Sequence, residues 1–282
     1  MIWHRRFVLK RPQEEWTDDP ILQKYKFTNV YRELDRGTQF LWGSVWHQKK
    51  LENILFPVVV YRFINRPEFF EWLGTSALDI DESSDIDSLC EHCVAYQKET
   101  GLPLFNTAYR VICNTPAGDT RVQELGRLLK EFQAHYDCII DKIMAANSLQ
   151  DLCTVLQEIK HVGPFLAYEI AMDLINLVPV LSKRFDEDEW ANVGPGAFIG
   201  LANIYPFQKE EWTRENQSMG LQACKMLRNN QKTFLPKEFP YYNGKPLSLR
   251  NIEHSLCEYG KYCNIRDGKG RARPLFHPTI HA

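Results

Sequence analysis

The stretch that most constrains the fold is residues 158–201, because it contains two Gly-Pro turns that each open a helical pattern. Apolar residues recur at helical spacing after Gly163, and a second such pattern follows Gly194 and Gly196. Proline is tolerated in the first turn of a helix, where its missing N–H loses no hydrogen bond. The spacing therefore predicts two helices that begin at these prolines, each with backbone N–H groups available to a phosphate.

Four consecutive acidic residues, 186–189, lie between the two turns and are followed by Trp190. A carboxylate that accepts a proton near neutral pH needs a pKa raised by burial. Trp190 is a large apolar neighbour, so it predicts burial for this end of the loop. We therefore take Asp188 and Glu189 as candidate catalytic carboxylates, with Asp186 third. The alternative interpretation is a solvated acidic loop between two ordinary proline-capped helices.

Composition sets broad limits. A chain of 282 residues with 44% hydrophobic residues can bury a substantial core, in one large domain or two small ones. Its net charge of −2 excludes a globally basic surface, so any contact with DNA has to be a local patch. No apolar run reaches the length of a membrane span, and the basic N-terminus lacks the apolar core of a secretory signal.

Eight scattered cysteines favour free thiols in a reducing compartment, which is the cytoplasm or nucleus, or the host cytoplasm if the protein is viral. Cys90 and Cys93 have the spacing of half a zinc site, but no second pair completes four ligands. The sequence therefore predicts no metal and no cofactor.

Apolar periodicity predicts helices along most of the chain. Residues 56–61 resemble a strand in composition, but their neighbours favour a helix. Besides the two that follow the Gly-Pro turns, the expected helices are 21–45, 51–70, 89–98, 119–146, 148–159, 208–230 and 249–259. No alternating pattern persists, so we expect an all-α fold. It is taken as a single domain over residues 1–282, in one body or two lobes, with a basic C-terminal tail.

The helix expected from residue 20 carries a group of polar side chains. Asn29, Arg32 and Arg36 lie at i, i+3 and i+7 and so share one face of a helix, with Lys26 beside Asn29. Arginine is suited to bidentate binding of phosphate. This spacing predicts that the four side chains bind a polyanion. A solvated face with internal ion pairs is the alternative.

Basic side chains also gather near the C-terminus, and no acidic residue follows Asp267. A local cluster of this kind neutralises several phosphates even in a near-neutral protein. The alternative is a flexible charged tail. The predicted DNA-binding residues of this segment are Lys261, Arg266, Lys269, Arg271 and Arg273.

The first Gly-Pro turn resembles the helix-hairpin-helix of DNA glycosylases, in which a Val-Gly turn holds the DNA backbone and an acidic residue further along works in the active site. His161 stands where that hairpin has its first glycine. The lysine that lyase-type members carry after the second glycine is absent, since Pro164 and Phe165 follow Gly163. The resemblance implies a glycosylase-like helical fold that binds DNA at this turn.

Four blocks of the sequence are similar to one family, the α-glutamyl/putrescinyl thymine pyrophosphorylases of phage DNA hypermodification. The group includes the helical domain of 5-hydroxymethyldeoxyuridine DNA kinases. The blocks are residues 16–36, 163–174, 194–197 and 252–262, with 105–109 as a weaker fifth. The first and last are the most distinctive, although Gly260 stands where an acidic residue is expected.

The resemblance implies an enzyme that flips a thymine bearing a 5-methyl pyrophosphate out of DNA and displaces the pyrophosphate with an amine, an amino acid or a polyamine. No Gly-x-x-x-x-Gly-Lys-Ser/Thr motif occurs, so a separate base kinase has to supply the pyrophosphate. The expected partners are DNA with hypermodified thymine, the amine and that kinase, without a membrane. Two alternatives stay open: a glycosylase that excises a modified base, and a non-catalytic DNA-binding module.

Overall fold

The computed structural model describes residues 15, 17–74, 78–106, 111–112, 115–206, 212–269 and 274–276. Within these ranges the chain is all-α, as expected, with fourteen α-helices and no strand. They are α1 (Pro20–Lys24), α2 (Arg36–Val45), α3 (Leu51–Ile64), α4 (Pro67–Leu73), α5 (Ile86–Thr100), α6 (Arg121–Ala134), α7 (Tyr136–Ala145), α8 (Leu149–Leu156), α9 (Pro164–Leu177), α10 (Pro179–Ser182), α11 (Pro195–Leu201), α12 (Gln217–Asn229), α13 (Gln231–Phe234) and α14 (Leu249–Arg266).

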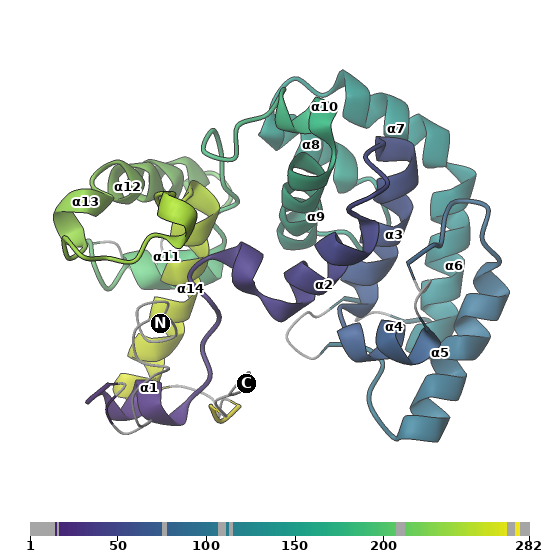
Figure 1. Cartoon of the computed structure of the whole chain (residues 1–282), viewed down its shortest axis with the longest axis horizontal. Helices are drawn as coiled ribbons and strands as arrows, with labels where there is room; N and C mark the ends of the chain where they lie inside the picture. The colour runs from purple at the N-terminus through teal and green to yellow at the C-terminus, as the bar shows by residue number, and fades with distance from the viewer. Residues whose placement is uncertain are drawn as a thin grey trace. The chain divides into compact units, whose positions relative to one another are not determined.

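The chain divides into two compact units. Arg36–Asp186 forms the central unit, and Met1–Asp35 together with Glu187–Ala282 forms the terminal unit, to which both ends of the chain contribute. The central unit contains α2 to α10, and the terminal unit contains α1 and α11 to α14 (Figure 1). The single glycosylase-like domain expected over residues 1–282 stays a prediction.

The core of the central unit is built on α3 and α9, which pack against each other (Figure 1). Both are apolar on nearly every face, the pattern of a helix enclosed by its neighbours. The strand-like run at residues 56–61 lies inside α3 and is completely buried. Its β-branched side chains are accommodated because the surrounding helices supply the packing that the local sequence does not favour.

The two Gly-Pro turns behave as predicted. Gly163 precedes α9 with φ −82° and ψ 175°, and Gly194 precedes α11 with φ −81° and ψ 179°. Each following proline occupies the first helical position, where no N–H is needed. The helix starts read from the sequence are therefore confirmed at both turns.

The single helix expected over residues 21–45 is wrong. α1 ends at Lys24, a 3-10 turn follows at Arg32–Leu34, and α2 begins only at Arg36. Backbone N–H groups of the intervening segment bond to distant partners instead of to the fourth preceding carbonyl. The bonds run from Lys26 N to Pro274 O (2.9 Å), from Thr28 N to Glu258 Oε2 (3.1 Å) and from Arg32 N to Asn251 Oδ1 (3.1 Å). Arg32 and Arg36 consequently do not share the face of one helix.

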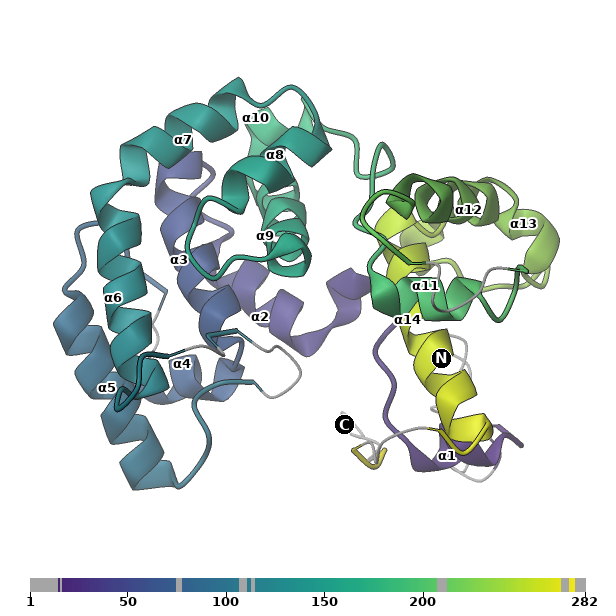
Figure 2. The same cartoon turned by 180° about the vertical axis from the view of Figure 1, so that it is seen from behind.

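The terminal unit is held by close packing of α11 on α14 (Figure 2). A Cβ at Gly200 would lie 2.1 Å from the carbonyl oxygen of Leu256, and one at Gly260 would lie 3.0 Å from the amide nitrogen of Gly200. Only a residue without a side chain permits this approach of two backbones. Glycine at position 260, where the family resemblance led us to expect an acidic residue, is therefore explained by helix packing.

None of the helices in the described ranges combines the length and the apolar character that a bilayer crossing requires. The seven cysteines in those ranges are free thiols, and four of them are buried. Groups of three or more metal-ligating side chains do not occur in the described part of the chain.

Candidate functional site

A pocket in the terminal unit lies between residues 19–30 and α14. Its volume is about 420 Å³, within the range of sites for small ligands. The lining residues are Asp19, Leu22, Phe27, Thr28, Asn29, Val30, Ser255, Glu258, Tyr259 and Tyr262. All ten belong to residues 16–36 and 252–262, the two blocks of sequence singled out as the most distinctive. Two segments more than 200 positions apart in sequence thus form one site.

Asp19 is the first carboxylate of the pocket, and it also caps α1. Its Oδ1 accepts the N–H groups of Ile21 (2.8 Å) and Leu22 (3.1 Å), and its Oδ2 accepts the hydroxyl of Tyr262 (2.5 Å). Partial burial alone raises the pKa of Asp19, but these hydrogen bonds outweigh it and leave the pKa below its usual value. The carboxylate is therefore ionised at neutral pH.

Glu258 is the second carboxylate, and its side chain is almost fully buried. Its Oε2 accepts the N–H of Thr28 at 3.1 Å, and its Oε1 accepts Lys261 Nζ at 2.6 Å. Asn29 donates its side-chain amide to Leu34 O at 2.7 Å, which orients that side chain at the pocket wall. The two segments are thus joined by a carboxylate that also lines the site.

Aromatic rings form the apolar part of the wall. Phe27 and Tyr262 have centroids 6.3 Å apart, and Tyr259 and Tyr262 are stacked with centroids 6.3 Å apart and planes at 11°. Ring faces next to carboxylates suit ligands that are either flat or cationic. Helical periodicity did not reveal this wall, because Phe27 lies beyond the end of α1, in a segment without regular helix.

In the acidic loop, Glu187 and Asp188 are half-buried, and Glu187 was not among the residues we selected. Burial raises the pKa of Glu187, and the neighbouring charges of Asp188 and Glu33 raise it further. Glu189 is exposed, so burial next to Trp190 does not extend to it. Sequence reasoning did not single out Glu187, because four adjacent carboxylates look alike until the tertiary structure partly removes some of them from solvent.

The other two acidic candidates have distinct surroundings. Asp188 pairs with Arg228, and its Oδ1 accepts the N–H of Leu249 at 2.7 Å, at the start of α14. A carboxylate at this position stabilises a helix N-terminus. Asp186 is exposed at the end of the central unit. Catalytic roles for these residues stay predictions.

The residues chosen to bind a polyanion are distributed over both units. Arg32 is buried in the terminal unit, with Nη1 3.7 Å from Asp35 Oδ1. Arg36 begins the central unit and forms exposed ion pairs with Glu68 (2.8 Å) and Glu71 (3.3 Å). Lys26 and Asn29 lie in the terminal unit, where Lys26 is exposed and Asn29 lines the pocket.

Three glycines were predicted to offer amides to phosphate. A Cβ at Gly163 or Gly194 would meet nothing within 4 Å, so the space beside both turns is open. At Gly196 it would lie 3.0 Å from Cys257 Sγ, which gives this glycine a packing role against α14. Phosphate contacts at the three positions stay predictions.

The basic residues near the C-terminus are partly neutralised. Lys261 pairs with Glu258, and Arg266 Nε lies 2.8 Å from Asp267 Oδ1. Lys269 is exposed. Arg271 and Arg273 lie outside the described residues. Residues 274–276 are described again, and Leu275 forms an isolated antiparallel β-bridge with Tyr25.

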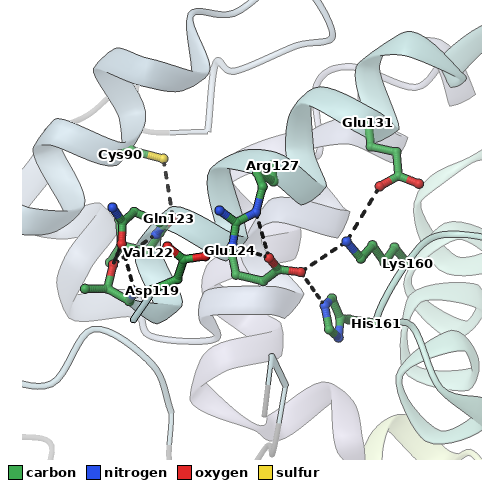
Figure 3. Close-up of polar contacts among 10 residues, drawn as sticks. Cys90, Asp119, Val122, Gln123, Glu124, Arg127, Glu131, Lys160 and His161 are labelled. Carbon is green, nitrogen blue, oxygen red and sulfur yellow. Dashed lines mark hydrogen bonds and ion pairs between the residues drawn. The ribbon is translucent and has the colours of Figure 1, made fainter. Parts of the chain in front are cut away.

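The helical hairpin of α8 and α9 is anchored to α6 by one buried carboxylate (Figure 3). Glu124 Oε1 contacts His161 Nε2 (2.9 Å) and Lys160 Nζ (3.2 Å) from the turn, while its Oε2 accepts Arg127 Nε (2.9 Å). His161 adopts φ +64°, the left-handed conformation that glycine usually occupies. The bond from the His161 side chain to Glu124, which glycine could not make, therefore offsets the cost of this backbone conformation.

These contacts predict a pH-dependent contribution to stability. Bonds to His161, then to Arg127, lower the pKa of Glu124 from 4.5 to about 2. Because the folded pKa is depressed, the stabilisation is present above pH 4.5 and is lost as the pH falls toward 2. We expect Glu124→Gln to lower the free energy of unfolding by about 1–3 kcal/mol at pH 7, and the difference from wild type to shrink below pH 4.5.

Denaturant unfolding from pH 7 to pH 2 measures this difference. Glu131→Gln is the matched control, since Glu131 is exposed and lies 4.0 Å from the same lysine. A difference between Glu124→Gln and wild type that stays constant over this range would contradict the assignment.

A second buried cluster lies in the core of the central unit. Asp173 binds Arg62 through two bonds, Nε to Oδ2 at 2.6 Å and Nη2 to Oδ1 at 2.8 Å, and accepts Trp42 Nε1 at 2.9 Å. Glu169 lies 3.6 Å from the same guanidinium. All three charged side chains are at most 1% exposed. The acidic residues of block 163–174 are therefore part of the core.

Comparison with known proteins agrees with this helical architecture. The family described as the helical domain of 5-hmdU DNA kinase matches residues 1–271. The chain belongs to that family. A 5-hmdU DNA kinase from Bacillus phage SP10 is 28% identical over 282 aligned positions, which cover 93% of this chain and 43% of the kinase. The chain thus spans less than half the length of this relative. No solved structure matches the present chain.

The family match confirms one part of the resemblance, the helical domain of the kinases. It extends over both distinctive blocks and so includes every residue that lines the pocket. The relation to the thymine pyrophosphorylases and to the glycosylase hairpin fold stays a prediction.

Proposed function

We propose that this chain acts in thymine hypermodification, displacing pyrophosphate from 5-pyrophosphomethyluracil in DNA with an amine. The observation that carries the proposal is the pocket, whose lining comes wholly from the two distinctive blocks of a family named for 5-hmdU DNA kinases. A pocket of aromatic rings, carboxylates and hydroxyls is suited to small organic groups, which a purely DNA-binding module does not need.

The reaction makes three demands on the protein. A C–N bond forms at the 5-methylene carbon while the C–O bond to pyrophosphate breaks, and pyrophosphate leaves with the electron pair. The amine nitrogen gives up a proton to a carboxylate, and water has to be excluded. Catalysis then rests on neutralising the leaving group and on a base of suitable pKa.

For the base we place Glu187 ahead of Asp188, Glu189 and Asp186. Its burial raises its pKa, which brings the carboxylate closer to the range where proton transfer at neutral pH is efficient. Asp188 is engaged at the start of α14, where a structural role accounts for it. Arg250 and Lys245 partly offset the rise at Glu187 and bring positive charge to the same region.

For the leaving group we keep Arg32 and Lys26 of the terminal unit as the proposed cationic contacts, and the role of Arg36, in the central unit, stays a prediction. Arg32 is buried beside α14, to which Asn251 ties its backbone. Arg36 is paired with two glutamates, so it would have to exchange those surface bonds for phosphate. Exposed pairs of this kind are weak enough to exchange.

DNA binding is proposed at the hairpin turn and the basic C-terminal segment. Gly163 is exposed at the turn with open space beside it, and Lys160 and Arg127 contribute partly exposed cations nearby. A glycosylase-like arrangement would let the protein hold a thymine outside the base stack, as base-modifying enzymes do. Lys269 and Arg266 would add phosphate contacts.

Mass analysis of nucleosides tests the proposal. Duplex DNA carrying 5-pyrophosphomethyluracil is incubated with the protein and a set of amines and then digested. A new amine-substituted thymidine is the expected product. Release of a free base would show instead that the protein is a glycosylase. Unchanged DNA would favour a non-catalytic DNA-binding module.

Variants of the acidic loop identify the base. We expect Glu187→Gln to reduce the single-turnover rate about a hundredfold, since loss of a general base has effects of this order. Glu238→Gln, an exposed carboxylate of the same unit, should retain the wild-type rate. A normal rate for Glu187→Gln, with a large loss in Glu189→Gln or Asp186→Asn, would move the role to that neighbour.

A further inference from the structure

We propose that residues 46–50, here called the Trp46 loop, bind an unpaired stretch of DNA by stacking the ring of Trp46 on a base. The loop connects α2 to α3 in the central unit (Figure 1). It lies outside the hairpin turn and the C-terminal segment, to which DNA contacts were assigned above. The inference goes beyond the proposed reaction and rests on it only for the choice of DNA as the ligand.

Trp46 is unusually exposed for so large a residue. It is 60% exposed, although tryptophan is highly buried on average. The residues on either side of the loop are anchored in the core, since Val45 is 1% exposed and Leu51 is 2% exposed. The backbone of the loop is also tied back, because Gln48 N donates to Val45 O at 3.0 Å. The fold therefore holds this ring in solvent on a fixed support.

The backbone at Lys49 is strained. Lys50 N donates to Gln48 O at 2.8 Å, which closes a three-residue γ-turn around Lys49, whose φ is +60°. The γ-turn with positive φ is the rare and strained form, which lysine adopts less readily than glycine. The same turn places Lys49 Nζ 3.4 Å from the centroid of the Trp46 ring. Strained residues that persist in a fold gather at binding sites, so this turn is a candidate for one.

The charges of the loop are positive. Residues 37–51 contain no aspartate or glutamate, whereas the loop has His47, Lys49 and Lys50. Both lysines are exposed, and the next carboxylate along the chain is Glu52, in the first turn of α3. An exposed ring beside two ammonium groups can stack on a base and contact the adjoining phosphates at the same time.

Unpaired DNA fits this loop better than a protein partner does. A base offers a free face for stacking where the duplex is open, as in a single strand or at a flipped nucleotide. A stable protein partner buries about 800 Å² on each side, around a packed apolar core. Five residues with one large exposed ring do not supply such a surface. An acidic protein segment would still be attracted to the two lysines, so the experiment includes one as a competitor.

Fluorescence anisotropy of a short labelled oligothymidylate, with the full chain, tests the assignment. We expect Trp46→Ala to weaken binding of this single strand about tenfold or more, because stacking of a base on an aromatic side chain has effects of this size. Affinity for a duplex of the same length should stay at the wild-type value, because paired bases leave no face for the ring. Phe234→Ala is the matched control, since Phe234 is 63% exposed but lies in the terminal unit.

Lys49→Gly separates binding from folding. Glycine adopts positive φ without strain, so this variant should melt at the wild-type temperature or slightly above it. It also removes an ammonium group, so the slope of log affinity against log salt should become shallower by about 0.7, the value for one phosphate contact on a single strand. Lys98→Gln, at an exposed position of α5, should change neither quantity.

Several results would overturn the inference. One is the absence of single-strand binding by the wild-type protein, and another is wild-type affinity for the single strand in both Trp46→Ala and Lys49→Gly. An equal loss of single-strand and duplex binding in Trp46→Ala would also refute it. Stronger competition by polyglutamate than by unlabelled oligonucleotide would assign the loop to an acidic protein instead.

The two proposals fail separately. Loss of single-strand binding in Trp46→Ala, together with unchanged DNA in the nucleoside assay, would support the Trp46 loop and refute the proposed reaction. Amine transfer to DNA by the wild-type protein, with single-strand binding unaffected by either loop variant, would support the reaction and refute the assignment of the loop.

Discussion

Replacing Asp173 with alanine is expected to lower the free energy of unfolding by about 3–5 kcal/mol and the melting temperature by roughly 10 °C. Asp173 is fully buried and forms two bonds with Arg62, which is equally buried. Without the carboxylate, the guanidinium loses both of these short bonds, and the contact to Glu169 at 3.6 Å is longer than either. A poorly compensated charge in a core is among the most destabilising changes a single substitution makes.

Thermal and denaturant unfolding measure this loss. Asp141→Ala, at an exposed position on α7, is the control and should change the free energy of unfolding by less than about 0.5 kcal/mol. Replacing all three charged residues with apolar ones (Arg62→Met, Glu169→Leu and Asp173→Leu) should recover much of the loss, because no charge is then left buried. A loss below about 1 kcal/mol in Asp173→Ala would contradict the buried ion cluster.

Gly200→Ala is expected to destabilise the terminal unit by about 3 kcal/mol, the upper part of the range for overpacking. The new Cβ would lie 2.1 Å from the carbonyl oxygen of Leu256, which is backbone and moves only if α11 and α14 separate. Because α14 also carries one wall of the pocket, the amine transfer proposed for this protein should slow together with the loss of stability.

Gly43→Ala is the matched control for this substitution. Gly43 lies within α2, and a Cβ there meets nothing within 4 Å. Alanine in an unobstructed helix is favoured over glycine by up to about 1 kcal/mol, so this variant should be as stable as wild type or slightly more stable. Equal melting temperatures for the two alanine variants would refute the close approach of α11 and α14.

Local features of the sequence determined much of the helical architecture. The starts of α9 and α11 follow from proline, whose chemistry acts within one turn of helix and is independent of the rest of the fold. The all-α class followed from apolar periodicity without a persistent alternation, and it holds throughout the described residues. Helix α8, with Ser148 as its N-cap, was likewise predicted from local signals.

Local features of the sequence determined less about the candidate site. Sequence similarity selected residues 16–36 and 252–262, and these are the segments that form the pocket. It did not indicate that Asp19, Glu258 and Tyr259 face a common space, because that requires contact between residues more than 200 positions apart. Helical spacing placed Arg32 and Arg36 together, whereas the helix it assumed is interrupted.

Tertiary structure alone decided the conformation of residues 25–35, the partial burial of Glu187 and the anchoring of the hairpin. Each depends on partners that are distant in sequence: Glu258 and Asn251 take the N–H groups of the first segment, and Glu124 holds the turn at His161. Hydrogen bonds to distant side chains replaced the local bonds that helical periodicity presupposes. Propensity acts over a few residues with small energies, so long-range hydrogen bonds and burial override it wherever the fold brings such partners together.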